Sequence, residues 1–251
     1  MSNKKIVWVP TPSFLYRNYL YKKIAQTLPK NSYFLDVGAG NGEFLKVLSG
    51  MGFHGESIDI SKEAVLHAKS QLKNVDNVSA KWGNIYNYKS TKKYDVIFCF
   101  ETMEHLENDL QALKKIYVLL KKGGIFVMSA PAHMSGWSRM DEIKGHYRRY
   151  EKKEIKAKYK QAKFKIKDIF TYGFPFLLLI RQISGTGKFI KSFTQHLDQD
   201  ARGEESSIQQ EYNPVLKEII TSPIMLFPLF KIMDLFIKTD LGLGYLVVAK
   251  K

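Results

Sequence analysis

Apolar residues recur every four positions near the start of the chain and gather into short runs beyond it. The spacing of Tyr16, Leu20, Ile24 and Leu28 predicts an amphipathic helix, which Pro29 ends. Short apolar runs predict strands at 33–37, 55–60, 77–82, 94–100 and 125–130, and helices are expected between them at 43–48, 63–72 and 106–120. Near-continuous apolar strands that alternate with helices are typical of a parallel sheet covered on both faces.

The pattern changes after residue 130. Residues 131–150 are polar and loop-like, 151–161 predict a helix, and strands are expected at 164–171 and 244–249. We therefore expect an α/β fold, with a Rossmann-like and mostly parallel seven-stranded sheet, helices on both faces and a helical insertion before the last strand.

The expected insertion is residues 172–240, and the main domain would be formed by 1–171 and 241–251. Two very apolar segments, 174–180 and 224–237, flank a polar stretch inside the insertion. They are too apolar for a solvated helix face. They would form a cap over the site, a dimer contact, part of the ordinary core or an element at a membrane interface.

The charge of the chain raises the question of partners. The net charge is +15, with lysines densest at 152–167. Such a surface attracts nucleic acid, anionic lipid or an acidic substrate, or is simply a solvated lysine-rich face. Lysine dominates over arginine, which makes sequence-specific nucleic-acid recognition less favoured.

Other features bear on the compartment. The single cysteine, Cys99, excludes an intramolecular disulfide, and the first ten residues lack the apolar core of a signal peptide. The longest apolar runs are too short to span a bilayer. We expect a cytoplasmic protein, with peripheral contact at the inner face of a membrane as an alternative.

A glycine-rich turn follows the first predicted strand. Residues 36–42 read Asp-Val-Gly-Ala-Gly-Asn-Gly, a Gly-x-Gly-x-Gly spacing preceded by an acid. The carboxylate of Asp36 would repel a pyrophosphate but attract the ammonium group of a methionine moiety. This disfavours a nicotinamide oxidoreductase, and a purely structural turn is the remaining alternative.

Polar side chains also follow the next three predicted strands. Asp59 is placed to accept two hydrogen bonds from a ribose, because Ser61 is available to cap the next helix. Asn84 would pair with an adenine edge and Ile85 would pack on its face, although Asn84 also suits a turn. After the fourth strand, Glu101, Glu104 and His105 would line the floor of the same site.

With these motifs in order, the chain resembles the class I S-adenosylmethionine-dependent methyltransferases, and most of all the ubiquinone-biosynthesis type of small-molecule O-methyltransferase. The resemblance covers about residues 16–130, with further matches at 145–150 and in the last strand. It implies S-adenosylmethionine as cofactor. The implied cofactor-binding residues are Arg17, Asp36, Gly38, Gly40, Asp59, Ile60, Asn84, Ile85, Phe100 and Glu101. One departure is Asn84, where the family usually has aspartate, so adenine binding is expected to be weaker or retuned.

Methyl transfer is an in-line displacement that needs mainly alignment, with a base if the acceptor is a hydroxyl. The expected catalytic residues are His146, His105 and Tyr147, and the expected substrate-binding residues are His133, Arg148 and Arg149. A structural loop histidine and a solvated arginine pair are the alternatives. No metal ion is expected.

The sequence therefore predicts methyl transfer to a small-molecule or lipid-like acceptor, with oxygen as the acceptor atom. A nucleic-acid methyltransferase is one alternative, but no Asn-Pro-Pro-aromatic motif of the amino-methylation type follows the fourth strand. Cys99 lies inside that strand, so it is poorly placed as a nucleophile that attacks a base. The other alternative is a non-catalytic, membrane-associated module that binds S-adenosylmethionine.

Overall fold

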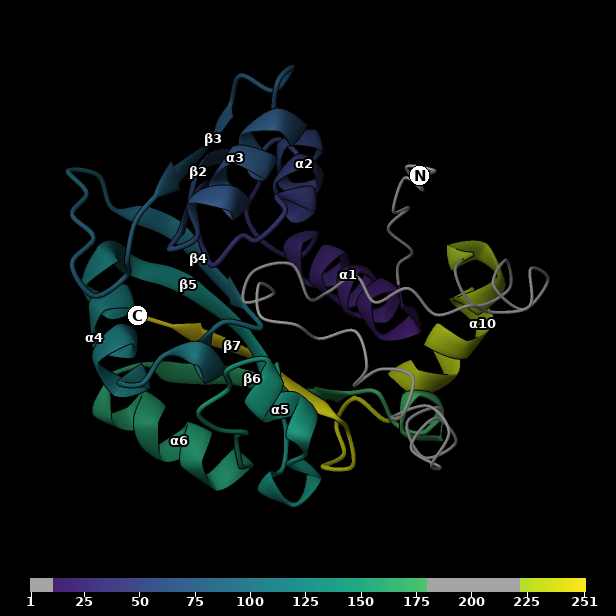
Figure 1. Cartoon of the computed structure of the whole chain (residues 1–251). Coiled ribbons are helices and arrows are strands. Elements are labelled where there is room, and N and C mark those ends of the chain that lie inside the picture. Colours follow the sequence, from purple (N-terminus) through teal and green to yellow (C-terminus); the bar gives the residue numbers. More distant parts are fainter. Residues whose placement is uncertain (1–10, 180–221) are drawn as a thin grey trace, which may run out of the picture.

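The alternation of strands and helices expected from the sequence is present in the computed structural model, in which residues 11–179 and 222–251 are described (Figure 1). The first part of the chain forms α1 (Pro12–Ala25), β1 (Tyr33–Val37), α2 (Glu43–Gly50), β2 (His54–Asp59), α3 (Lys62–Gln71), β3 (Val78–Trp82) and β4 (Tyr94–Phe100). The next part forms η1 (Met103–His105), α4 (Asp109–Leu119), β5 (Leu120–Pro131), η2 (Met134–Gly136) and α5 (Arg139–Ile143). The last elements are α6 (Lys152–Gln161), β6 (Lys165–Tyr172), α10 (Pro223–Asp234) and β7 (Gly244–Lys250).

The strands form one seven-stranded sheet in the order β3-β2-β1-β4-β5-β7-β6. β1 to β5 are parallel, whereas β7 runs antiparallel to both β5 and β6. The predicted α/β fold with a mostly parallel sheet is confirmed. Because β1 to β5 point the same way, their carboxyl ends share one edge, and the loops that follow them meet there.

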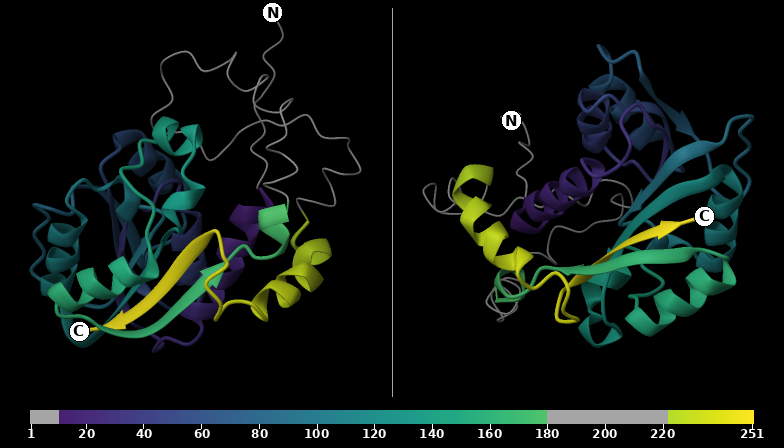
Figure 2. Two further views of the ribbon diagram at one scale, coloured as in Figure 1. Left: turned by 90° about the horizontal axis from the view of Figure 1, so that it is seen from below. Right: turned by 180° about the vertical axis from the view of Figure 1, so that it is seen from behind.

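Helices cover both faces of the sheet, as the two further views show (Figure 2). Alternate residues of each strand point to opposite faces. Phe34 and Phe98 therefore pack with α1, α2, α3 and α10, whereas Leu35 and Ile97 pack with α4 and α6. Phe98 has no exposed surface, and removing such a ring usually costs about 3–5 kcal/mol of unfolding free energy. This packing holds the strand ends that carry the site.

Two local predictions differ from the structure. A strand was expected only from residue 125, but β5 already begins at Leu120, and Gly123, with φ +79°, lies in an irregularity of that strand. The segment 131–150, expected as a loop, contains η2 and the short helix α5. The capping box between Ser138 and Asp141 explains the start of α5, because each residue satisfies a backbone N–H of the other.

The described part of the expected insertion is a short stretch after β6 and helix α10. Ser222 caps α10 through the N–H of Met225. Phe230 of α10 packs on the rings of Tyr16 and Tyr19 in α1, with centroid distances of 5.1 and 5.5 Å. The polar stretch at 195–212 lies outside the described residues. The division into a domain and an insertion therefore stays a prediction.

Candidate functional site

The glycine turn after β1 contains three glycines with left-handed backbones. The φ angles of Gly38, Gly40 and Gly42 are +78°, +52° and +79°, a region that side chains other than glycine seldom adopt. A Cβ on Gly38 would lie 2.2 Å from Oγ1 of Thr102, and one on Gly42 would lie 2.8 Å from Cβ of Ala68. A Cβ on Gly40 would meet nothing within 4 Å. The backbone at Gly40 is therefore the open part of the turn, where a ligand can approach.

Two carboxylates flank this open backbone. Asp36 is only 4% exposed, and burial, together with the charge of Asp59, raises the pKa of Asp36 to about 7. Asp59 accepts hydrogen bonds from the N–H groups of Gly40 (3.1 Å) and Ser61 (2.9 Å). The cap of α3 is Ser61, as expected, since its hydroxyl accepts from the N–H of Ala64. Two nearby acids suit a cationic ligand with hydroxyl groups and disfavour a pyrophosphate.

The next loops carry the residues expected at an adenine. Ile60 and Trp82 are 66% and 64% exposed, and the indole N–H of Trp82 donates to the carbonyl of Ile60 (3.0 Å). Together they present an apolar surface at the ends of β2 and β3. The side-chain oxygen of Asn84 accepts from the N–H of Tyr86 (3.0 Å), which is a turn contact, and Ile85 is buried in the core. Trp82 was not predicted, although an aromatic residue at a strand end was a usable signal.

A polar network holds Glu101 at the end of β4. The carboxylate of Glu101 accepts from Arg17 (3.0 Å), Tyr172 (2.6 Å) and Ser129 (2.7 Å). Burial opposes its ionisation, but the Arg17 guanidinium and the two hydroxyls outweigh burial and hold the pKa of Glu101 below its usual range. Glu101 has a left-handed φ of +47°, and such strain is concentrated at functional sites. Because Arg17 already pairs with Glu101, a contact between Arg17 and a cofactor carboxylate would have to compete with this ion pair.

The ring of Phe100 lies next to this network, against α1. It stacks on Tyr21 with a centroid distance of 3.7 Å and an interplanar angle of 3°. The hydroxyl of Tyr21 shares a hydrogen bond with Ser129 (2.6 Å). Tyr21, Ser129 and Tyr172 were not predicted, because they come from elements whose contacts are distant in the sequence.

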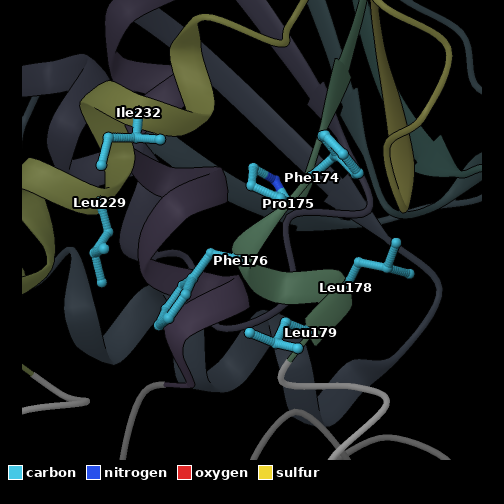
Figure 3. Close-up of a pocket in the computed structure, with 7 residues that line it drawn as sticks. All are labelled: Phe174, Pro175, Phe176, Leu178, Leu179, Leu229 and Ile232. Carbon is cyan, nitrogen blue, oxygen red and sulfur yellow. The ribbon is translucent and has the colours of Figure 1, made fainter.

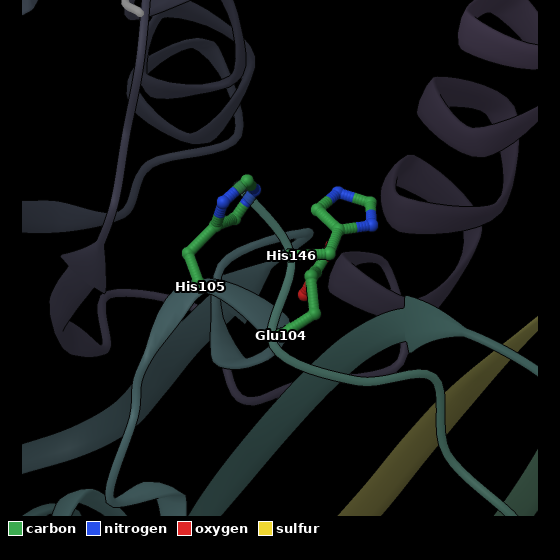
Figure 4. Close-up of side chains that lie close together, drawn as sticks. All are labelled: Glu104, His105 and His146. Atoms are coloured by element: carbon green, nitrogen blue, oxygen red, sulfur yellow. The ribbon is translucent and has the colours of Figure 1, made fainter. Parts of the chain in front are cut away.

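Three further side chains meet beside β4 (Figure 4). Single ligand atoms of Glu104, His105 and His146 all lie within 4.8 Å of one another, and the two rings meet edge to face at 4.6 Å. Glu104 is 1% exposed, and its Oε2 has no hydrogen-bond partner. Burial and the neighbouring Glu101 raise the pKa of Glu104 well above its usual range, whereas desolvation and His146 lower that of His105 to about 4. Such a set suits a shared proton and could also hold a divalent cation.

The residues after β5 occupy different places. Nδ1 of His146 lies 3.0 Å from Oδ1 of Asp141. The buried guanidinium of Arg149 forms a bidentate ion pair with the same carboxylate. Arg148 pairs with Asp109 (3.0 Å) and donates to the carbonyl of Glu107. Both guanidinium groups are thus paired with acids of the chain, so a substrate clamp by Arg148 and Arg149, which stays a prediction, would have to compete with these ion pairs.

His133 and Tyr147, the other predicted residues of this region, are not brought together by any contact in the described residues. Nδ1 of His133 lies 3.2 Å from Glu151, and its Nε2 is buried without a partner. Tyr147 is 57% exposed, and its N–H donates to the carbonyl of Glu104 (2.8 Å). Tyr147 therefore joins the Glu104 cluster through its backbone, with its ring at the surface.

Two apolar pockets lie on the α1 and α10 side of the molecule. One of about 370 Å³ is lined by Leu229 and Ile232 of α10 and by Phe174, Pro175, Phe176, Leu178 and Leu179 (Figure 3). The other, of about 310 Å³, lies among α1, α2 and α10 and is lined in part by Phe44. Phe44 contacts Phe100 edge to face at 5.3 Å, so the second pocket borders the strand ends that carry the polar groups.

Known proteins match both the sequence and the fold. A family model described as a methyltransferase domain matches residues 15–168. The ubiquinone biosynthesis O-methyltransferase of Rickettsia canadensis (strain McKiel) is 33% identical over 96 residues, which are 38% of this chain and 41% of the relative. The chain thus spans about two fifths of the length of this and similar curated relatives.

Solved structures share the fold at lower identity. An S-adenosylmethionine-dependent methyltransferase from Mesorhizobium loti aligns with a TM-score of 0.57 and 14% identity, over 93% of this chain and 97% of that one. The N-methyltransferase NodS from Bradyrhizobium japonicum WM9, in complex with S-adenosyl-L-homocysteine, aligns with a TM-score of 0.54 and 17% identity, over 63% and 79%. At such identities the likeness concerns the fold alone.

Proposed function

Since a family model matches its residues 15–168, this chain belongs to the methyltransferase-domain family, and we propose that it transfers a methyl group from S-adenosylmethionine to an oxygen of a small or amphiphilic acceptor. The prediction of an S-adenosylmethionine-dependent methyltransferase domain is confirmed by this match and by the fold. The acceptor and its reacting atom are the proposed part.

The observation that carries the proposal is the open backbone of Gly40 between Asp36 and Asp59. S-adenosylmethionine supplies an activated methyl group on a positively charged sulfur, and it also carries an ammonium group and a ribose. Two acids beside an uncrowded turn match those groups in charge and in hydrogen bonding. Asp36 would face the ammonium group and Asp59 the ribose, while Gly38 and Gly40 allow the chain to turn and the ligand to approach.

The other residues predicted to bind the cofactor differ in how far their exposure and hydrogen bonds fit that role. The exposed surface of Ile60, extended by Trp82, offers a face on which an adenine can pack. Ile85 is buried in the core. The side-chain oxygen of Asn84 already accepts a hydrogen bond from the N–H of Tyr86. Phe100 and Glu101 end β4, and the acid is kept ionised by Arg17. An ionised carboxylate here would favour a sulfonium over a neutral sulfur.

The acceptor is proposed from the chemistry next to β4. His146 and His105 supply imidazoles that can take a proton from a hydroxyl as the oxygen gains the methyl group. Tyr147 and His133 would contact the acceptor from the loops after β5. The apolar pocket bordered by Phe44 suits a hydrocarbon part. The name of the Rickettsia relative, an O-methyltransferase of ubiquinone biosynthesis, supports an oxygen acceptor with an apolar portion.

Peripheral membrane contact is the second part of the proposal. Ile224 and Leu235 of the α10 region are 85% and 78% exposed, and Lys231 lies between them in sequence. Apolar side chains beside lysines favour a bilayer surface with anionic lipid. Within residues 11–179 and 222–251, no helix is long and apolar enough to cross a membrane.

Transfer of labelled methyl groups tests the proposed function. The full chain is incubated with S-adenosylmethionine labelled in the methyl group and with three acceptors: a phenol with an alkyl tail, the same phenol without the tail, and mixed RNA. We expect label in the tailed phenol, with less in the short phenol. Label in RNA alone would support the nucleic-acid alternative, and cofactor binding without transfer to any acceptor would support a non-catalytic module.

A further inference from the structure

The carboxylate of Asp141 is held by more partners than a surface aspartate usually has. It accepts from Nε and Nη2 of Arg149 (2.8 and 2.9 Å) and from the N–H and hydroxyl of Ser138 (2.8 and 2.9 Å). Asp141 is 2% exposed and Arg149 is 9% exposed. Burial opposes ionisation, but the bonds from Arg149 prevail and lower the pKa of Asp141 to about 2. The carboxylate is therefore ionised and fixed in one orientation.

One oxygen of this fixed carboxylate faces His146. Nδ1 of His146 lies 3.0 Å from Oδ1 of Asp141. An ionised carboxylate can only accept hydrogen bonds, so Nδ1 must carry a proton. In a neutral imidazole the other nitrogen, Nε2, is then the acceptor. Nε2 of His146 has no hydrogen bond to any residue within 11–179 and 222–251, so its lone pair is available.

Two backbone hydrogen bonds also hold the segment that carries His146. Gly145 adopts a left-handed φ of +69° after α5, which turns the chain back so that the N–H of His146 donates to the carbonyl of Asp141 (2.9 Å). The next N–H, of Tyr147, donates to the carbonyl of Glu104 (2.8 Å). The loop after β5 is thereby attached to η1, which directly follows β4. His146 is thus fixed beside the strand end on which the proposed cofactor site lies.

We infer that Asp141, clamped by Arg149, is a positioning residue that holds His146 with Nε2 ready to accept the proton of the methyl acceptor. This inference rests on the proposed function and gives a positioning role to Asp141 and to Arg149, which the sequence predicted to bind substrate. In the step, Nε2 takes the proton of the acceptor hydroxyl, and the oxygen forms a bond to the methyl carbon. The carbon–sulfur bond breaks, and its electron pair stays on the sulfur, which leaves as a neutral thioether.

The charged and titratable groups that face His146 come from three elements. Asp141 lies on α5, Lys144 in the following turn, and Glu104 and His105 on η1, with Glu101 at the end of β4. Asp141 alone among them is bonded to a ring nitrogen of His146 in the described chain. It is therefore the group that sets which nitrogen carries the proton.

The tautomer can be tested on the unmodified protein. In protein labelled with ¹⁵N at histidine, the neutral ring of His146 should show a protonated Nδ1 and an unprotonated Nε2. A proton on Nε2 instead would overturn the inference. This measurement needs neither an acceptor nor turnover, so its outcome is independent of the proposed function.

Substitution tests the role in turnover. Asp141→Asn should lower kcat about 100-fold, the usual size of a general-base contribution, with KM for S-adenosylmethionine changed less than threefold. Asp141→Asn in a His146→Ala background should have almost no additional effect. Asp109→Asn is the matched control, because Asp109 is also a buried acid paired with cations, Arg148 and Lys158, but has no histidine partner. It should leave kcat unchanged.

Three outcomes separate the inference from the proposed function. Wild-type transfer to the phenol with an unchanged kcat in Asp141→Asn would overturn the inference and leave the function intact. Absence of wild-type transfer to any acceptor would overturn the function, while the ¹⁵N spectrum would still support or reject the positioning of His146. Loss of transfer in EDTA with recovery on adding Mn²⁺ would make His146 a metal ligand and also overturn the inference.

Discussion

At the scale of single residues, the turn after β1 was largely predictable and the acceptor side was not. Asp36 and the glycines act through local backbone geometry, which six or seven consecutive residues determine. Arg149 could not be assigned in this way, because its partner Asp141 lies on a helix that the sequence did not predict. The Ser138-x-x-Asp141 pattern of a capping box was the missed signal.

The open position in the glycine turn gives the first prediction. Gly40→Arg should abolish detectable binding of S-adenosylmethionine, because the side chain would fill the only uncrowded approach among the three glycines of the turn. A non-glycine residue at φ +52° also strains the backbone by about 1 kcal/mol. Titration calorimetry measures the binding, and thermal unfolding checks the fold.

The control for this change is Gly50→Arg, at the exposed end of α2, where a Cβ likewise meets nothing within 4 Å. It should bind the cofactor as the wild type does. Unchanged affinity in a folded Gly40→Arg protein would contradict the cofactor site proposed at this turn.

The raised pKa of Asp36 gives a pH-dependent prediction. With a pKa of about 7 in the free protein, Asp36 is mostly neutral at pH 5.5 and must lose its proton to pair with an ammonium group. Affinity for S-adenosylmethionine should therefore rise about tenfold from pH 5.5 to 7, a window in which an α-amino group stays protonated. Calorimetry over this range should show protons released on binding.

The same group should affect stability in the opposite direction. A carboxyl whose pKa is raised by folding stabilises the folded state fully at low pH, and this contribution is lost as pH rises through about 7.

Asp36→Asn should bind the cofactor more weakly but with an affinity that does not vary from pH 5.5 to 7. A wild-type affinity that is equally flat would show that Asp36 does not face the ammonium group.

At the scale of elements, the strands were predictable because their apolar runs are contiguous. Each of the seven expected strands is present, most with ends within one or two residues of the expected position. The order of the strands was not available from periodicity, because pairing such as that of β7 between β5 and β6 joins segments over 70 residues apart. The early start of β5 has the same cause: Leu120 pairs with Tyr94, a contact that local pattern cannot show.

The contact between α1 and α10 is another pairing over a long sequence distance, and it gives a prediction on stability. Asp234 accepts from the hydroxyl of Tyr19 and from Lys23, both at 2.8 Å, and from Tyr16 at 3.4 Å. Asp234→Ala would leave the buried Tyr16 hydroxyl without this partner and should lower the free energy of unfolding by about 1–3 kcal/mol. Urea denaturation measures it.

Asp76→Ala, at an exposed position before β3, serves as the control and should change stability by less than about 0.5 kcal/mol. If Asp234→Ala were as stable as this control, the hydrogen bonds from Tyr19 and Lys23 would contribute nothing measurable to the free energy of unfolding. In that case α10 would be held by its apolar face alone.

At the scale of the whole molecule, the charge and the apolar insertion were visible in the sequence, but their placement was not. Composition predicted a basic protein, and the apolar segments predicted a cap, a dimer contact, ordinary core or a membrane element. The structure places α10 against α1, on the face of the sheet opposite α4 and α6 (Figure 1). Its exposed apolar residues thus lie near the pockets, away from the lysine-rich helix α6.

This arrangement leads to a prediction about membranes. The chain should bind vesicles that contain anionic lipid better than neutral ones, and less well as salt is raised, because lysines contribute to the attraction. Ile224→Glu combined with Leu235→Glu should weaken binding to these vesicles at least tenfold, since each buried aliphatic side chain contributes about 1.5–3 kcal/mol.

The matched control is Leu66→Glu with Val118→Glu, which adds the same charge at residues 67% and 55% exposed on α3 and α4. Both double variants lower the net positive charge equally, so a difference between them reports on the place of contact and not on charge. Equal weakening would mean that the basic surface binds the vesicle without a preferred face. The rate of methylation of the tailed phenol, measured with and without vesicles, then separates the two uses of α10. An acceptor drawn from the bilayer should be methylated faster when the chain is bound to vesicles. A helix that only covers the pockets should give the same rate in both conditions.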